Sequence, residues 1–304
     1  MKAVVLLNES AGTLAASRDG GEAARIRAGF AAHGVDADVR SVSPDDLERV
    51  SREAAADAAV AAVVAGGGDG TLNTIAAALA GTGKPFGVLP LGTHNHFAKD
   101  MAVPLDLGDA VAALARGVAR GHFRDVDVGE VNGRAFLNFS GIGLHPLVVK
   151  HRDVQRAVLG RRKFVALVVA LLRVLRRPPV LRARLETAAF SVKRITPSVI
   201  VCNNPHQMRV FGVDNVSHAD RSVLNVYVAR STNWAGLVWL IVRAAFRTLD
   251  SARTFEAFTL TDVTIHTRRR SARVSIDGEV TDLPTPLVYR VSRGGLRVVE
   301  PVVE

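Results

Sequence analysis

A short apolar run that ends in a cluster of glycines constrains the fold of this 304-residue chain more than any other feature. Residues 60–65 are all alanine or valine, and they are followed by Gly66, Gly67, Gly68, Asp69, Gly70 and Thr71. Consecutive glycines permit positive φ angles and let the backbone come close to another group. The pattern predicts a buried strand that turns into a helix over residues 72–79. In a parallel sheet such a turn lies at the carboxyl ends of the strands, where ligands bind.

The rest of the N-terminal part repeats this alternation of strand and helix. Strands are predicted at residues 3–7, 35–42, 60–65 and 85–89, and helices at 21–33, 45–58 and 72–79. Strands that alternate with helices at this spacing predict a doubly wound α/β domain with a parallel sheet. We place this domain over residues 1–124.

From residue 125 the pattern changes to short β-rich segments with polar turns. The predicted strands are residues 125–131, 134–139, 182–185, 190–192, 198–202, 223–228, 255–258, 262–267 and 272–276. They predict a second, mostly antiparallel domain over residues 125–304, interrupted by helical insertions near 148–177 and 233–249. Whether the last segment returns to the first domain stays open, as does the pairing of exposed strands across a homodimer.

Composition excludes several classes of protein. The single cysteine, Cys202, cannot form an internal disulfide or a cysteine-based zinc site, which fits a reducing compartment such as the cytoplasm. The longest apolar runs, residues 164–172 and 234–242, hold roughly nine residues each, whereas a membrane span needs about 20. The net charge of +10 suits anionic lipid headgroups, nucleic acid or a polyphosphate. Aromatic residues make up only 5%, so platforms for stacking single-stranded bases are scarce.

The glycine cluster is suited to binding phosphate. Its successive N–H groups can point at phosphate oxygens, the Thr71 hydroxyl can add a donor, and the helix that follows presents its positive N-terminal end. Asp69 would repel a phosphate unless it holds Mg²⁺ or contacts an incoming hydroxyl group. The order of residues matches neither a Walker loop nor a G-x-G-x-x-G dinucleotide fingerprint. A glycine-rich turn that binds no ligand is the alternative.

Three further segments occur in order around this cluster. They are Asn8-Glu9-Ser10-Ala11-Gly12, Leu89-Pro90-Leu91-Gly92-Thr93-His94-Asn95-His96-Phe97-Ala98-Lys99 and Ile276-Asp277-Gly278-Glu279. Together with the glycine cluster they resemble, over nearly the whole chain, the diacylglycerol kinase catalytic-domain superfamily, which includes bacterial lipid kinases, sphingosine kinases and ceramide kinases. The resemblance implies an N-terminal nucleotide-binding domain, a C-terminal antiparallel β-sandwich and an active site in the cleft between them.

The resemblance also implies roles for individual residues. The nucleotide would be held by Asn8, Gly12, Gly66, Gly67, Gly68, Asp69, Gly70, Thr71, Gly92, Thr93 and Asn95. Glu279, or Asp277 beside it, would accept the proton of the substrate hydroxyl, and Asp69 would act with a catalytic Mg²⁺. The residues near the substrate would be Asp127, His96 and Lys99. Phosphoryl transfer needs a metal that neutralises charge and a carboxylate in line with the nucleophile. Ordinary solvent-exposed turns are the alternative at Asp127 and at residues 277–279.

Several positions depart from the family pattern. Glu9 replaces the usual proline, and His96 stands where aspartate is common. Lys99 replaces arginine, so the charge remains but the bidentate geometry is lost. The acidic cluster that holds a structural Mg²⁺ in some bacterial members reads Asp220-Arg221-Ser222-Val223-Leu224-Asn225 here. Asp220 is its one remaining acid, so we expect that metal site to be weakened or absent.

These observations predict a kinase that uses ATP and Mg²⁺ and transfers the γ-phosphoryl group to a hydroxyl of diacylglycerol or a related lipid. Basic and apolar residues in the two insertions would bring it to an anionic membrane surface, as a cytoplasmic protein peripheral to the inner membrane face, unless their apolar faces simply cover the β-rich domain. The alternatives are an NAD kinase-like or phosphofructokinase-like phosphotransferase with a soluble acceptor, and a catalytically weak lipid- or nucleotide-binding protein. No nucleic-acid recognition motif occurs, so nucleic acid is not an expected partner.

Overall fold

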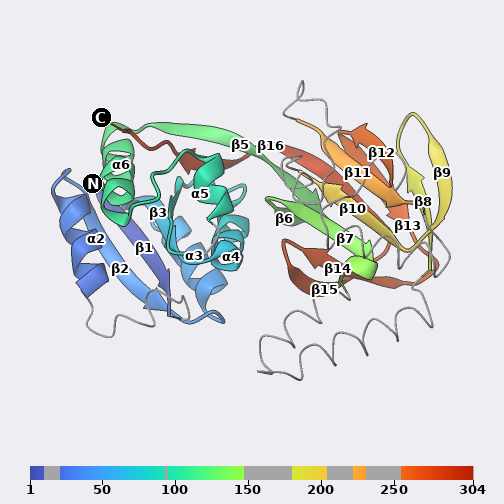
Figure 1. Ribbon diagram of the computed structural model, residues 1–304, viewed down its shortest axis with the longest axis horizontal. Coiled ribbons are helices and arrows are strands. Elements are labelled where there is room, and N and C mark those ends of the chain that lie inside the picture. The colour runs from blue at the N-terminus through green and yellow to red at the C-terminus, as the bar shows by residue number, and fades with distance from the viewer. Residues whose placement is uncertain (10–20, 93–94, 147–179, 204–221, 231–254, 304) are drawn as a thin grey trace. The chain divides into compact units, whose positions relative to one another are not determined.

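The chain divides into two compact units. The computed structural model describes residues 1–9, 21–92, 95–146, 180–203, 222–230 and 255–303. Unit 1 comprises Met1–Val128 and Arg293–Glu304, and unit 2 comprises Gly129–Ser292. Two strands, β5 (Phe123–Val131) and β16 (Leu287–Val299), have residues in both units (Figure 1).

Unit 1 is built around a parallel sheet. Its strands are β1 (Lys2–Asn8), β2 (Asp36–Val42), β3 (Val60–Gly66) and β4 (Phe86–Leu89), paired in the order β2-β1-β3-β4. Its helices are α2 (Gly21–Ala31), α3 (Leu47–Ala56), α4 (Asp69–Leu79), α5 (His96–Asp100) and α6 (Leu107–Arg120). Helices α2 and α6 pack together on one face of the sheet, and α3 and α4 pack together on the other (Figure 1).

This layering follows from the apolar strands. Residues 3–7 of β1 are all apolar and at most 1% exposed. A strand buried on both faces has to be covered by helices on both faces, as in parallel α/β sheets. Helix α6 supplies part of that cover: Asp106 accepts a hydrogen bond from Asp109 N at its start, and Gly121, with φ 66°, ends it.

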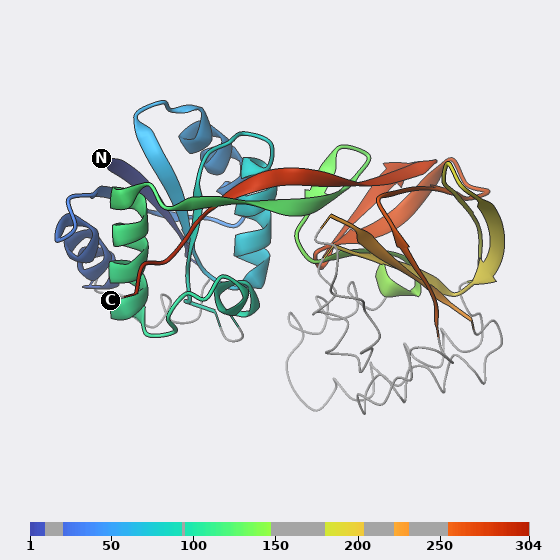
Figure 2. The same cartoon turned by 90° about the horizontal axis from the view of Figure 1, so that it is seen from above.

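Unit 2 is a β-sandwich. Its further strands are β6 (Arg134–Phe136), β7 (Phe139–Gly143), β8 (Leu181–Glu186), β9 (Ser191–Thr196), β10 (Ser198–Cys202), β11 (Leu224–Ala229), β12 (Phe255–Leu260), β13 (Asp262–His266), β14 (Ser271–Ile276) and β15 (Glu279–Pro284). One sheet runs β16-β13-β8-β9 and the other β12-β11-β10-β7-β14-β15, all antiparallel (Figure 2). Leu185 and Ile265 from the first sheet share one core with Ile142 and Val226 from the second.

The predicted fold class is confirmed, with corrections to individual elements. The helix predicted over residues 72–79 begins three residues earlier, at Asp69. The strand predicted over 134–139 is interrupted after Phe136, because the N–H groups of residues 137–139 bond to the Asp277 side chain. Helices α5 and α6 and strands β15 and β16 were not predicted. Both predicted insertions, 148–177 and 233–249, lie outside the described residues. Among the described residues, no helix has the length and apolar character needed to cross a membrane.

Candidate active site

In the glycine turn between β3 and α4, packing requires glycine at two positions and leaves open space at a third. A Cβ on Gly66 would lie 2.5 Å from Leu7 Cδ2, and a Cβ on Gly67 would lie 2.8 Å from Thr71 Cβ. The turn therefore needs glycine at both positions. A Cβ on Gly68 would meet no atom of the described residues within 4 Å, and the φ of −81° at this residue suits any side chain. The fold does not require a glycine there, and the space is available to a ligand.

The open position is also the start of a helix. Gly68 precedes the 11-residue helix α4, and no side chain at that position caps the helix. The first N–H groups of a helix have no partner within it and carry partial positive charge. An exposed helix start beside open space can bind the oxygen atoms of an anion such as a phosphate.

A side-chain hydrogen bond ties the end of β1 to this turn. Asn8 Nδ2 donates to Thr71 Oγ1 over 2.7 Å. Thr71 is buried and Asn8 partly buried, so the bond is largely shielded from water. Because β1 and β3 are neighbours in the sheet, the bond joins two adjacent carboxyl ends. The structure thus brings the predicted residue Asn8 together with the predicted glycine turn.

The segment after β4 packs against the same turn. A Cβ on Gly92 would lie 2.9 Å from Gly68 Cα, so only glycine allows this approach. Asn95, with φ 51°, accepts a hydrogen bond from Gly92 N at its Oδ1 over 2.8 Å. Its Nδ2 donates to Pro90 O over 3.2 Å. Asn95 therefore shapes the segment that holds Gly92 against Gly68.

Four further predicted residues lie in helices α4 and α5 of unit 1. Lys99 lies in the last turn of α5 and is exposed. Gly70 is the second residue of α4 and is exposed. Asp69 and His96 are the first residues of α4 and α5, and their side chains lie outside what the structure describes. Gly12, Thr93 and Asp220 also lie outside the described residues.

Asp127 is held by a backbone contact to β16. Its Oδ1 accepts a hydrogen bond from Gly294 N over 2.8 Å. Gly294 has φ 59°, a conformation that favours glycine. Two residues before it on β5, Asp125 forms an ion pair with Arg297 over 2.8 Å. The aspartates of β5 therefore help to fix the course of β16.

In unit 2 the predicted carboxylates sit at a tight hairpin turn. Ile276 and Glu279 pair across a two-residue turn in which Asp277 has φ 47° and Gly278 has φ 92°. Positive φ at both central residues is characteristic of a type I′ turn, and Asp-Gly is a preferred sequence for it. The turn leaves Glu279 exposed and Asp277 partly buried.

The Asp277 carboxylate binds the backbone between β6 and β7. It accepts hydrogen bonds from the N–H groups of Leu137 at 2.7 Å, Asn138 at 2.9 Å and Phe139 at 3.0 Å. Burial raises the pKa of Asp277 to about 6. The charge of Glu279 also raises this pKa, whereas the three N–H bonds lower it. Asp277 thereby fixes the turn that carries Glu279.

Sequence reasoning missed the three peptide groups that hold Asp277. Their contribution comes from backbone N–H groups, which every residue type except proline carries, so the identities of Leu137, Asn138 and Phe139 give no signal. The Asp-Gly dipeptide between two β-rich segments is a hairpin signal that could have located β15. Within the described part of the chain, no group of three or more His, Cys, Asp or Glu side chains is arranged to hold a metal ion.

The N-terminal part of the chain matches a known family of protein domains. Residues 2–131 match the model of the diacylglycerol kinase catalytic domain. This match confirms the predicted resemblance over the N-terminal part of the chain.

Curated relatives match the same part. A protein of Pseudomonas aeruginosa named probable lipid kinase YegS-like is 41% identical over 119 residues, which is 38% of this chain and 37% of the relative. A protein of the same name from Yersinia enterocolitica is 37% identical over 122 residues, which is 38% of this chain and 39% of the relative. The chain thus spans little more than a third of the length of the relatives it matches.

A solved structure resembles the whole chain. The match to the crystal structure of a diacylglycerol kinase from Bacillus anthracis covers 100% of this chain and 98% of that chain, with a TM-score of 0.67. Its sequence identity is 20%, so this likeness establishes the fold alone.

Proposed function

We propose that this protein is an ATP-dependent kinase that transfers a phosphoryl group to a hydroxyl of diacylglycerol or a related lipid at a membrane surface. The observation that carries the proposal is the turn at Gly68, where open space and an uncapped helix start meet the segments of Asn8 and Gly92. This arrangement suits the phosphate groups of a nucleotide. The family match and the names of the relatives support kinase chemistry on a lipid.

The residues of unit 1 would bind and orient ATP. Residues 66–71 would hold the phosphates, and Asn8 would keep Thr71 in place through their hydrogen bond. Asn95 would support the turn from the other side by holding Gly92. Mg²⁺, when bound, neutralises charge on the phosphates, and Asp69 is the residue that we propose to hold it.

Glu279 is the better candidate for the general base. The carboxylate oxygens of Asp277 already accept three backbone hydrogen bonds, whereas Glu279 is exposed. We therefore propose that Glu279 accepts the proton of the lipid hydroxyl and that Asp277 positions the turn. A positioned carboxylate of this kind typically contributes about 10²–10⁴ in rate.

The test is transfer of radiolabel from γ-³²P-ATP, with Mg²⁺, to a mixed lipid extract. Wild type would be compared with Asp69→Asn, Glu279→Gln and the control Glu48→Gln, which changes an exposed acid on α3. We expect a labelled lipid with wild type and with the control, and its loss in the other two variants. The identity of the labelled lipid would give the acceptor.

The lipid-kinase proposal would be contradicted if the protein labelled no lipid from the diacylglycerol, ceramide, sphingosine and glycolipid pools. Labelling of NAD instead would identify a soluble acceptor. ATP binding without transfer to any acceptor would indicate a binding protein.

A further inference from the structure

A basic pocket lies at one end of unit 2, away from the hairpin turn of Asp277. It occupies about 870 Å³ where the turn of residues 267–270 connects β13 of one sheet with β14 of the other. The ends of β7 and β8 and residue Asp282 of β15 complete its lining. Along β14 the pocket residue nearest to Asp277 is Arg273, four residues before it, which is roughly 13 Å at about 3.3 Å per residue. This pocket is therefore distinct from the candidate active site.

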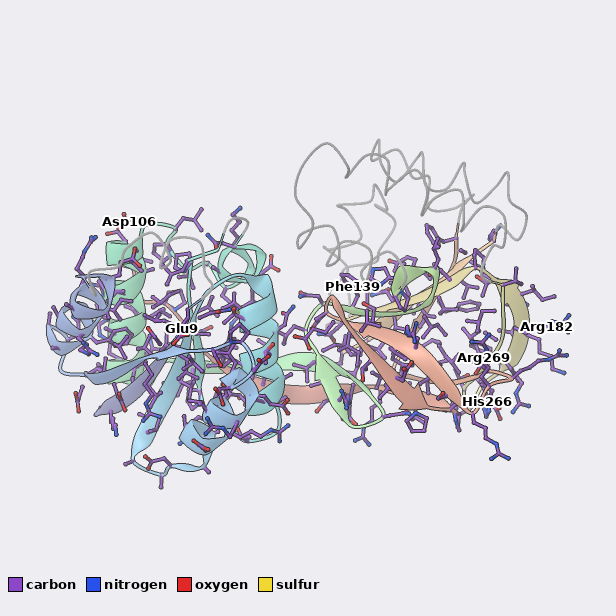
Figure 3. The ribbon with its side chains drawn as sticks, turned by 90° about the horizontal axis from the view of Figure 1, so that it is seen from below. Glu9, Asp106, Phe139, Arg182, His266 and Arg269 are labelled. Carbon is purple, nitrogen blue, oxygen red and sulfur yellow. The ribbon has the colours of Figure 1, made fainter. Side chains whose placement is uncertain are left out.

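Arginines dominate the lining. They are Arg182, Arg268, Arg269, Arg270 and Arg273. Among the described residues of the lining, Asp282 is the one acid, and it pairs with Arg273 over 3.5 Å. Among the residues that the structure describes, none of the other four arginines forms an ion pair. Figure 3 shows Arg182 and Arg269 at the same end of unit 2. Positive charges concentrated in this way attract an anion.

The turn that carries three of these arginines is held in place by hydrogen bonds to its backbone carbonyls. The carbonyl of Arg269 accepts hydrogen bonds from the hydroxyl groups of Thr267 and Thr285, and the carbonyl of Arg270 accepts one from Thr285 N. The side chains of Arg268, Arg269 and Arg270 remain exposed. A fixed turn that presents three guanidinium groups suits phosphate, which arginine can bind with two parallel N–H bonds.

Apolar side chains stand beside the arginines. Val180, in the pocket lining, is 48% exposed, and Ile195 on β9 is 53% exposed. Ile195 pairs directly with Arg182 across β8 and β9, so the two side chains share the outer face of that sheet. Exposed apolar groups next to basic ones are the composition of a surface that lies against a membrane, with phosphate contacts and shallow apolar insertion. A soluble phosphate would make no use of Val180 and Ile195.

We propose that this arginine pocket binds the phosphate group of an anionic phospholipid, and so docks unit 2 on an anionic membrane, with Val180 and Ile195 entering the interface. The proposal deepens the proposed function, on which it rests for the presence of a lipid acceptor in that membrane. It assigns membrane docking to a site other than the one that carries the chemistry.

The test is sedimentation of the full chain with vesicles of phosphatidylcholine alone or with roughly one-third phosphatidylglycerol. The test variant is Arg268→Gln/Arg269→Gln/Arg270→Gln. The control is Arg25→Gln/Arg52→Gln/Arg120→Gln, which removes the same charge from helices of unit 1. Each arginine near an anionic surface contributes about fivefold to binding, so we expect the test variant to bind roughly a hundredfold more weakly to anionic vesicles and the control to lose far less. Val180→Ser/Ile195→Ser should weaken binding as well.

Several outcomes would overturn the proposal. One is equal binding of wild type to neutral and anionic vesicles, and another is equal loss in the test and control variants. Glycerol phosphate that binds wild type but not the test variant, with vesicle binding unchanged, would assign the pocket to a soluble phosphate. Loss of duplex DNA binding with vesicle binding unchanged would assign it to nucleic acid.

A separate assay distinguishes failure of membrane docking from failure of the proposed kinase activity. Phosphate transfer would be measured to a short-chain diacylglycerol dispersed in detergent, where no anionic membrane is needed. We expect the test variant to retain transfer in that assay. Vesicle binding that depends on the arginines, in a wild-type protein without transfer, would uphold the docking site and reject the kinase proposal.

Discussion

Asn8 Nδ2 donates a hydrogen bond to Thr71 Oγ1 over 2.7 Å, between residues that are 63 positions apart in the sequence. The bond joins the end of β1 to the first turn of α4, so it fixes where the helix start lies relative to the sheet. Because Thr71 also fills the space beside Gly67, one side chain sets both the packing and the orientation of the glycine turn.

Thr71→Val tests this relationship, because valine keeps the shape of threonine and removes the hydroxyl. We expect the free energy of unfolding to fall by about 1 kcal/mol, the net value of one hydrogen bond. We also expect the KM for ATP to rise roughly fivefold, since the helix start loses its tie to β1. Thr74→Val is the matched control: Thr74 lies one turn further along α4 and donates to Gly70 O. An equal rise in KM for both variants would contradict the role of Asn8 and Thr71.

Two glycines of the candidate site, Gly92 and Gly68, should respond differently to replacement by alanine. Gly92→Ala would place a Cβ 2.9 Å from Gly68 Cα, and such overpacking costs typically 1–3 kcal/mol, so the midpoint of thermal unfolding should fall. A Cβ in Gly68→Ala meets no atom of the described residues within 4 Å, so the midpoint should fall far less than in Gly92→Ala. If phosphate occupies that space, Gly68→Ala should weaken ATP binding about tenfold or more, as measured by calorimetry.

The control for Gly68→Ala is Gly21→Ala at the start of α2, where an added Cβ likewise meets none of the described atoms within 4 Å. It should alter neither the unfolding midpoint nor the affinity for ATP. Unchanged ATP binding in Gly68→Ala would mean that the open space is not the phosphate site.

The strand-and-helix alternation of unit 1 could be predicted because a parallel sheet covered on both faces produces uninterrupted apolar strands, such as residues 3–7. Helix α6 was missed because Gly108 and Gly117 lie within it and lower its helical propensity. Gly117 is there because a side chain would collide with the Glu300 carbonyl, a contact between segments far apart in the sequence. Local patterns do not contain such contacts.

The candidate site shows the same division. Asn8, the glycine turn and Gly92 could be named from short motifs, because each motif is a local run of residues. The contribution of Asp277 could not be inferred, since its partners are backbone N–H groups about 140 residues away. The pattern left the choice between Asp277 and Glu279 as base open, and the hydrogen bonds of Asp277 now favour Glu279.

Replacing the two carboxylates of the hairpin turn, Asp277 and Glu279, should have different effects on the free energy of unfolding. Asp277→Ala leaves three backbone N–H groups without their acceptor, and each lost bond of this kind costs about 1–3 kcal/mol. We therefore expect the free energy of unfolding to fall by about 3 kcal/mol or more, as measured by urea denaturation. Glu279→Gln changes an exposed side chain and should stay within about 0.5 kcal/mol of wild type. Comparable destabilisation by both changes would refute the division of roles.

The raised pKa of Asp277 gives the stability of the protein a pH dependence with a definite sign. Burial holds this pKa at about 6 in the folded protein, against an ordinary value of 3.8. Between about pH 4 and pH 6 the folded state therefore binds a proton that the unfolded state has lost. The contribution of Asp277 to the free energy of unfolding should fall as the pH rises through this window and then level off.

Urea denaturation at a series of pH values would measure this contribution as the difference between wild type and Asp277→Asn. The difference should decline from pH 4 to pH 6. Asp125→Asn is the control with the opposite sign: Arg297 lowers the pKa of Asp125, so its contribution is present above about pH 4 and lost only below it. Over the same window the difference for Asp125→Asn should stay nearly constant. If the difference for Asp277→Asn is equally flat, then Asp277 is already ionised at pH 4, and its three N–H bonds outweigh its burial.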